Sequence, residues 1–521
     1  MKFKQLMALA LIGFAVGACK RPDGGEDSAN VDPEGKTVKG KIAITLPKTI
    51  RTYAPGDTDP NATAEEINAT TMDVFIYNDG GSYTLAYTNR LTYSATGPLG
   101  NQFAPSTAGT EFETAEFTIT EGDKLVYIGI NLPDLIANRL RTGYYVNEIY
   151  ENPDLFSKLL NNGGAGNVAF FNAGIVGHDF KAIADGGDGP TVTIPVSRLV
   201  AKVAVMTPTG SDTWEVNGGT VKDFEFAIGQ RNNQMFVLPR TDYTDPNYDI
   251  NAADGNLGDG STAKLANDFA AYSATGDKSS FVDFKTTDPN VLYLTENMSA
   301  AHQHKDLTYV SIRAMFVPHR WGADPEAGGA VNTIEGDFWA VFTGDAVGDD
   351  GLGVRYFDDV DDARAFVASP EFAAMTGQTV TPYAGTPGDP INESAVLGEA
   401  DFYIHFYDDG YCYYRIYLNP DGEGPGTDMV EAYDIIRNSA YLATITGVNY
   451  IGTTAPEILP GSKNANDKGT PTYPGDWFPN NYLPAAVQAS DVVEPEPTVS
   501  SLSVSVTLDP WELEEGNYQT Y

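Results

Sequence analysis

The sequence predicts a mainly β protein. Gly (53) and Pro (32) are abundant, and so are Tyr (29) and Phe (25), a mixture that favours short strands and turns over helical bundles. Hydrophobic residues make up 42% of the chain, which is enough to build packed cores. A length of 521 residues suggests about three domains, or two large ones if they are rich in strands.

The charge balance excludes one class of partner. Acidic residues outnumber basic ones by 71 to 32, which gives a formal net charge of −39. Because such a surface has few cations with which to neutralise phosphates and release their counterions, we do not expect nucleic acid to bind.

Residues 1–19 have the features of a lipoprotein signal peptide. Two lysines precede an apolar run at residues 6–16, which is long enough for a signal-peptide core and too short for a mature membrane span. The run ends in small residues followed by Cys19, a pattern similar to the lipobox at which this cysteine would be acylated. An ordinary secretory cleavage just before Cys19 is the alternative, and both predict export. With Cys19 lipidated, Cys412 is the only remaining thiol, which excludes an intramolecular disulfide.

Residues 20–51 are expected to form a propeptide that contains an exchangeable strand. After a polar tether, residues 38–46 alternate with the period of a half-buried strand. The apolar face of this strand holds Val38, Ile42, Ile44 and Leu46. The turn-rich segment that follows should expose the bond between Arg51 and Thr52 to a protease, and a cut after Lys48 is the alternative. Loss of residues 1–51 would leave 23 basic and 66 acidic residues, a net charge of −43.

The end of the chain carries a second strand of the same pattern. After a Glu-Pro-Glu-Pro spacer, one face of residues 501–508 holds Leu502, Val504, Val506 and Leu508. The segments 42–46 and 504–508 share the order β-branched, small, β-branched, Thr, Leu. Either segment could therefore fill the same groove by strand addition, which supplies apolar contacts and backbone hydrogen bonds together. The alternative is that both are ordinary terminal strands of separate domains.

Six further segments form a series along the chain. They are INATTMDVFIY (67–77), LVYIGINLP (125–133), VTIPVSRLVAKVAV (192–205), YCYYR (411–415), RNSAYLATI (437–445) and VTLDPW (506–511). In this order, and together with the lipobox and a basic residue at a suitable distance from it, the series resembles the type V pilus fimbrillins of Bacteroidetes. Among them it is most similar to the major-subunit family of the short (minor) fimbriae.

This resemblance implies two transthyretin-like, Greek-key β-sandwich domains in tandem, at residues 52–240 and 241–497, with a donor-strand segment at 498–521. It implies a shaft subunit of a surface fimbria (pilus) that supports adhesion. The precursor would be anchored to the outer membrane by lipid, cut after Arg51 by an arginine-specific protease and polymerised by donor-strand exchange. Its partners would be other copies of itself and accessory anchor and tip subunits.

Several local features can be predicted inside the domains. Segments 133–141 and 153–161 have helical spacing with Pro near the start. Residues 402–418 are expected to form a hairpin that turns at an Asp-Asp-Gly sequence. Arg198 and Lys202 are expected on one face of a strand, at an acidic rim, and Cys412 in the core.

We expect neither enzymatic activity nor a cofactor. The chain lacks G-x-S-x-G, H-E-x-x-H and the phosphate-binding Gly-rich loop. His302 and His304 are explained better by a polar loop than by a zinc site, so no metal is expected. The acidic segments 245–260 and 358–362 could bind calcium, but 245–260 lacks the spacing of an EF-hand and solvated charge is the simpler interpretation.

Two other functions fit the same export signal. A fimbrial anchor would keep its N-terminal strand, and a tip subunit would need no donor strand. A monomeric glycan-binding surface lipoprotein would need exposed tryptophans, and the five Trp residues follow no pattern.

Overall fold

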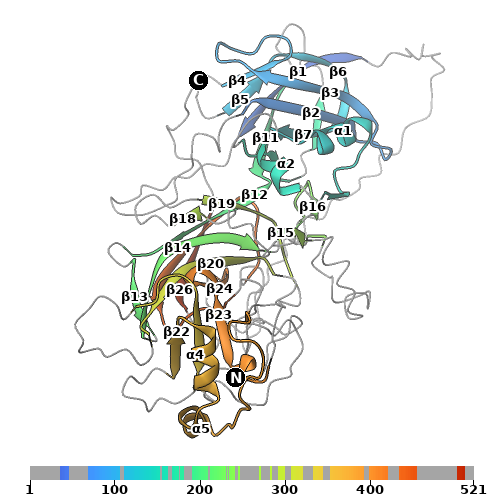
Figure 1. Cartoon of the computed structure of the whole chain (residues 1–521). Helices are drawn as coiled ribbons and strands as arrows, with labels where there is room; N and C mark the ends of the chain where they lie inside the picture. The colour runs from blue at the N-terminus through green and yellow to red at the C-terminus, as the bar shows by residue number, and fades with distance from the viewer. Residues whose placement is uncertain are drawn as a thin grey trace, which may run out of the picture. The chain divides into compact units, whose positions relative to one another are not determined.

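The computed structural model confirms the mainly β fold class (Figure 1). The structure describes residues 36–45, 69–105, 111–152, 155–161, 167–174, 177–180, 190–208, 212–216, 218–229, 231–232, 234–240, 245–246, 269–270, 282–283, 291–299, 307–320, 333–343, 353–391, 398–419, 433–454 and 502–510.

The strands of the N-terminal region form one sheet that closes on itself. Its members are β1 (Thr37–Thr45), β2 (Thr71–Asn78), β3 (Leu85–Tyr93), β4 (Gln102–Pro105), β5 (Glu111–Thr114), β7 (Gly122–Ile130), β9 (Phe170–Asn172) and β11 (Thr191–Arg198). Pairing runs from β7 through β2, β3, β4, β5, β1, β11 and β9, and β9 pairs again with β7. β6 (Phe117–Thr120) attaches to β1, and β10 (Gly177–Phe180) attaches to β7. Closure leaves few unpaired backbone groups at sheet edges.

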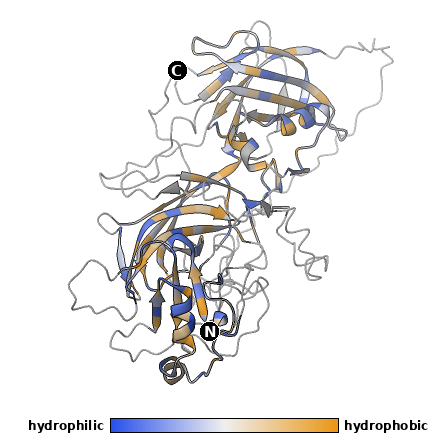
Figure 2. Cartoon of the chain, in the orientation of Figure 1, coloured by the Kyte–Doolittle hydropathy of each residue, from blue (hydrophilic) through white to orange (hydrophobic). Residues whose placement is uncertain are grey.

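The interior of this closed sheet is the first hydrophobic core. In β11 the side chains of Val192, Ile194 and Val196 are buried while Thr191, Thr193 and Pro195 are exposed, so the inner row is apolar up to Arg198 at its end. Figure 2 shows hydrophobic and hydrophilic bands alternating along the strands. The helices α1 (Asp134–Thr142) and α2 (Leu155–Asn161) add apolar side chains to this core. Their positions match the helices predicted at 133–141 and 153–161.

The C-terminal region is built from several smaller sheets. Its strands are β12 (Val200–Met206), β13 (Trp214–Val216), β14 (Gly219–Gly229), β15 (Arg231–Asn232), β17 (Phe269–Ala270), β18 (Val282–Asp283), β19 (Val291–Thr295), β20 (Tyr309–Pro318), β24 (Tyr411–Tyr417), β25 (Ser439–Val448) and β26 (Leu502–Pro510). β8 (Ile149–Glu151) and β16 (Gln234–Phe236) pair with each other, and their Tyr150 and Met235 belong to the first core. One sheet has the order β19–β12–β25–β26, and another has the order β13–β14–β20–β24 with β18 on β14. Their apolar faces form a second core. The pairs β15–β17 and β16–β8 are separate two-stranded sheets.

A third, smaller core belongs to the segment between β20 and β24. It contains β21 (Phe338–Phe342), β22 (Val354–Phe357), α4 (Val360–Val367), α5 (Pro370–Thr376), the 3₁₀ turn η4 (Ala400–Tyr403), β23 (Ile404–Tyr407) and the turn η5 (Asp408–Gly410). Asp359 caps α4, and Ser369 caps α5 by accepting a hydrogen bond from the backbone N–H of Phe372. Over the residues that the structure describes, no helix has both the length and the hydrophobicity that a membrane span requires.

β12 joins the second set of sheets by pairing with β19 and β25, whereas Met235, Val237 and Leu238 still pack in the first core. The domain boundary expected between residues 240 and 241 therefore stays a prediction. One predicted element is wrong. The segment 402–418 does not form a hairpin, because β23 pairs with β21 while β24 pairs with β20. The turn between β23 and β24 therefore carries the chain from one sheet into another.

Arg198 and Lys202 are buried, contrary to the expectation of an acidic rim. Arg198 is 0% exposed and Lys202 is 1% exposed. The Arg198 guanidinium lies over the ring of Phe170, 5.2 Å from its centroid, and donates to Asn438 Oδ1 at 3.3 Å. Arg198 ends β11 in its buried inner row, and Lys202 lies in β12, where every side chain is buried. The two residues therefore belong to different strands, and neither is at an exposed rim.

Cys412 lies in the second core, as the sequence predicts, and burial raises the pKa of its thiol to about 11. Because the thiolate is the reactive form, we expect Ellman's reagent at about pH 8 to react with it at least roughly a hundredfold more slowly in the native protein than in the unfolded one. The rate of colour release measures this in a chain that starts after Cys19, where Cys412 is the only thiol. Equal rates in native buffer and in denaturant would contradict the burial.

Candidate functional site: the first strand and its groove

β1 has an internal position in the closed N-terminal sheet. Its first half pairs antiparallel with β6, with Val38 opposite Ile119 and Gly40 opposite Phe117. Its second half lies between β5, to which it runs antiparallel, and β11, to which it runs parallel. Since β1 is paired on both sides, its removal would leave two strands with unpaired backbone groups.

The apolar row of β1 points into the first core. Val38 is 6% exposed, and Ile42 and Ile44 are both 0% exposed. Ile42 lies opposite Val192 of β11, and Ile44 lies opposite Ile194. Burial of three aliphatic side chains of this size contributes about 5–9 kcal/mol before ordering costs. Removing the strand would therefore expose a long apolar groove.

One backbone donor of β1 is satisfied by a side chain. The N–H of Ile42 donates to Thr114 Oγ1 at 3.1 Å, and Thr114 is 1% exposed. Thr114 comes from β5, which is far from β1 in the sequence, so the local pattern around either residue gave no signal for this bond. The groove thus contains one polar contact in an otherwise apolar interior.

Two ion pairs line the outer face of β1. Lys41 Nζ lies 2.5 Å from a carboxylate oxygen of Glu113, and Lys39 Nζ lies 3.1 Å from one of Glu116. All four side chains are partly exposed, so each pair contributes about 0–1 kcal/mol. The buried row and the backbone pairing therefore contribute more than these charges to holding β1 in place.

β26 is an edge strand in a sheet of its own subunit. Among the strands that the structure describes, it pairs only with β25, to which it runs antiparallel. Leu502 is 5% exposed against the second core, whereas Val504 and Val506 are only half-buried there. The backbone of Leu508 pairs with Tyr441. β26 is therefore packed against its own subunit, as expected if it is an ordinary terminal strand. However, it is paired on one side only, and its apolar side chains are less buried than those of β1.

Several predicted site residues lie outside the described residues. They are Cys19, Leu46, Lys48, Arg51 and Thr52, together with His302 and His304. The lipidation site, the maturation cut and the last apolar position of the first strand therefore stay predictions.

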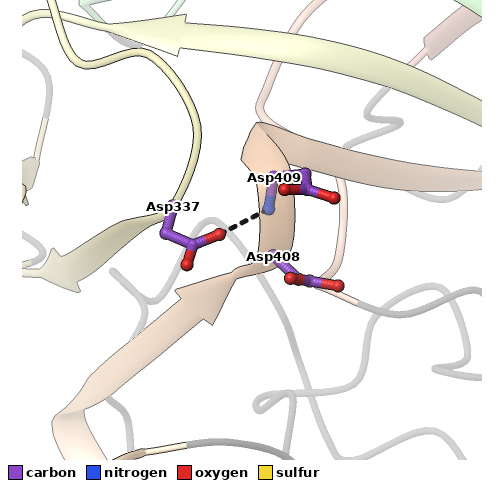
Figure 3. Close-up of side chains that lie close together, drawn as sticks. All are labelled: Asp337, Asp408 and Asp409. Atoms are coloured by element: carbon purple, nitrogen blue, oxygen red, sulfur yellow. Dashed lines mark hydrogen bonds between the residues drawn. The ribbon is translucent and has the colours of Figure 1, made fainter.

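Three carboxylates gather at the turn between β23 and β24. Asp337, Asp408 and Asp409 are exposed, and one oxygen of each lies within 4.8 Å of the others. Asp337 Oδ1 accepts a hydrogen bond of 2.7 Å from the backbone N–H of Asp409 (Figure 3). Asp409 has a φ of 53°, so the Asp337 carboxylate stabilises a left-handed turn conformation. This contact explains the position of Asp337 without a cation.

The acidic residues considered for calcium have structural contacts where the chain is described. Asp245 is 5% exposed and accepts a hydrogen bond from the backbone N–H of Met298. Asp359 caps α4, and Asp358 forms an ion pair with Arg320. Folding contacts therefore account for these three carboxylates.

The C-terminal region matches a family of known proteins. The model of "Major fimbrial subunit protein type IV, Fimbrillin, C-terminal" covers residues 405–517, which include β24, β25 and β26. The C-terminal region of this chain is that of a fimbrillin. The match confirms the resemblance to fimbrillins over these residues and supports a role as a fimbrial subunit.

Solved structures of similar proteins span most of the chain. A cell adhesion protein of Parabacteroides distasonis ATCC 8503 is 11% identical, with 92% of this chain and 100% of that chain covered and a TM-score of 0.43. A fimbrilin of Porphyromonas gingivalis W83 is 11% identical, with 91% and 98% covered and a TM-score of 0.41. The tip fimbrial protein of Porphyromonas gingivalis, with a C-terminal truncation, is 10% identical, with 79% and 96% covered and a TM-score of 0.34. No curated protein sequence matches this chain.

Thr114→Val tests the polar contact in the groove. The substitution keeps the shape of the side chain and removes the acceptor of the Ile42 N–H, so it should lower the free energy of unfolding by about 1–3 kcal/mol. Urea denaturation of the uncleaved chain measures the loss. Thr118→Val, on the exposed face of the neighbouring β6, is the matched control and should change stability by less than about 0.5 kcal/mol. Equal effects of the two variants would show that the bond to β1 does not stabilise the sheet.

Proposed function

We propose that the protein is a shaft subunit of a surface fimbria and that the groove under β1 accepts β26 of another copy. The observation that carries this proposal is the position of β1 inside a closed sheet, paired on both sides. A turn-rich segment with Arg51 follows this strand, so a single cut there would separate β1 from the rest of the chain. Departure of β1 would then open the sheet and leave a groove that only another strand can fill.

The sequence of β26 supports its assignment as the donor. When Ile42 is aligned with Val504 and Ile44 with Val506, the Thr-Leu pairs that follow also coincide. In its own sheet β26 has a single partner strand among those described, whereas the groove offers β5 on one side and β11 on the other. The exchange therefore adds a second ladder of backbone hydrogen bonds and covers the apolar row more completely.

The energies are large enough for a durable polymer. Four apolar side chains at about 1.5–3 kcal/mol each give roughly 6–12 kcal/mol before ordering costs. Part of this is offset because Leu502, Val504 and Val506 leave a partly covered site on the second core. The added backbone pairing and the deeper burial in the groove supply the net driving force.

The same cut would release the subunit from the membrane. In the proposed precursor, lipid on Cys19 anchors the chain to the outer membrane, and an arginine-specific protease cleaves after Arg51. Cys19 and β1 belong to the same propeptide, so cleavage removes the anchor and the strand together. Accessory anchor and tip subunits would close the two ends of the fibre.

Arg51→Ala tests the maturation cut. The variant should accumulate as uncleaved monomer at the membrane because both its anchor and its β1 strand are retained. N-terminal sequencing of wild-type surface material should begin at Thr52, and Lys48→Ala is the matched control that should mature normally. A blocked N-terminus at Cys19 in wild-type material would instead support a fimbrial anchor or a monomeric glycan-binding lipoprotein.

Val504→Lys tests donation by β26. In the groove this residue would take the place of Ile42, which is 0% exposed, whereas in its present position it is only half-buried. The charge should therefore abolish high-mass ladders on unheated gels while the monomer still folds, as circular dichroism would show. Ser503→Lys adds the same charge where Lys41 lies beside Glu113 and should polymerise normally. Normal ladders from Val504→Lys would refute donation by this strand.

A further inference from the structure

One position of β1 differs sharply in size from its counterpart in β26. The alignment of Ile42 with Val504 places Gly40 at the position of Leu502. Both positions belong to the inner rows of their strands, because residues two apart in a strand point the same way. Gly40 is buried, and Leu502 is 5% exposed. β1 therefore has no side chain at a buried position where the other strand has a branched aliphatic one.

A cavity lies beside this position in the closed sheet. Gly40 pairs with Phe117, and the neighbouring Ile42 bonds to Thr114. Both partners line a cavity of about 170 Å³. Val74, Tyr87 and Leu91 also line it, and Gly100, Asn101, Ala115 and Glu116, which are exposed or partly exposed, form its open end.

Side-chain contacts place the cavity on the inner face of the sheet. Tyr87 stacks on Phe117 with 4.6 Å between ring centroids. Val74 is 1% exposed and Leu91 is 3% exposed, and both belong to the first core. The cavity and position 40 of β1 therefore face the same interior, next to the strands that flank the groove.

We propose that this cavity is the acceptor pocket for Leu502 of an incoming copy. The proposal rests on the strand exchange proposed above and adds the residue that distinguishes the donor from the strand it replaces. An apolar cavity of about 150 Å³ in a protein core can hold benzene, so the side chain of Leu fits in this volume. Because β1 has only a glycine at this position and β26 would place a leucine there, β1 is the poorer occupant of its own groove.

Competition between peptides tests the pocket directly. The receptor is the full chain carrying Val504→Lys, which blocks its own donor strand, after cleavage at Arg51. A labelled peptide of residues 499–510 reports on the groove by fluorescence anisotropy, and unlabelled peptides compete with it. Leu502→Gly should weaken competition by roughly ten- to a hundredfold, as the loss of one buried aliphatic side chain requires. Ser503→Gly, which removes a side chain from the opposite face, should compete within about threefold of the wild type.

A second variant fills the pocket from the receptor side. Leu91→Phe should reduce the difference between the wild-type and Leu502→Gly peptides to less than about threefold, because the space is then occupied by the receptor. Gly40→Leu in the precursor should make β1 fill its own pocket and slow ladder growth at least about tenfold after cleavage.

The outcomes separate the pocket from the exchange itself. If the wild-type and Leu502→Gly peptides bind equally well, the pocket is refuted while strand donation stands. If no peptide of residues 499–510 binds the cleaved receptor, both proposals are refuted. A Leu502 preference that persists unchanged in Leu91→Phe would place the Leu502 site elsewhere in the groove and overturn the assignment of this cavity.

Discussion

The closure of the N-terminal sheet through β1 is the constraint on which the rest of the structure depends. β1 joins β5 to β11, and without it the circle of paired strands is open at two edges. A strand that closes a sheet is normally the least removable part of a fold, since its backbone and its side chains are both buried. Here that strand is followed by a segment whose turn residues and basic side chain suit proteolysis. In the proposed maturation, the position of β1 would therefore let a single covalent change convert a closed subunit into one that needs a partner.

The positions of β1 and β26 are unequal, and this inequality would give the proposed exchange a direction. β1 has two partner strands and a fully buried row at Ile42 and Ile44, whereas β26 has one described partner and half-buried side chains at Val504 and Val506. The ladder between β25 and β26 is also irregular between Ile445 and Gly447, which weakens the pairing locally. β26 is therefore easier to detach than β1, and in a closed sheet it would gain a second partner strand and deeper burial of its apolar side chains. In the proposed exchange, the stability of each subunit and the growth of the fibre would be compatible for this reason.

The sequence predicted the strands and helices that follow from the spacing of apolar residues. It did not predict features that depend on which distant strands pair with one another. Alternation located β1 and β26, and helical spacing after Pro located α1 and α2. The aromatic segment at 402–418 has the pattern of a hairpin, but its two strands find better partners in β21 and β20, which no local rule can identify. The same limit explains Arg198, whose strand pattern is visible although the elements that bury it are distant in sequence. The role of Thr114 has the same origin, because its partner Ile42 is fixed only when the sheet closes.

The strand that lines the groove is connected to the partner of β26 by backbone and by strand pairing. β11 lines the groove, and after Leu199 the same backbone continues as β12, which pairs with β25, the partner of β26. At this crossing the N–H of Asn438 donates to the carbonyl of Val200 at 2.9 Å, and its side chain accepts hydrogen bonds from Arg198. In a fibre formed by exchange, tension that enters beside β11 would therefore reach β25 along covalent backbone and a parallel ladder. Arg198 is buried at this crossing, and its two hydrogen bonds to Asn438 connect the end of β11 to the start of β25.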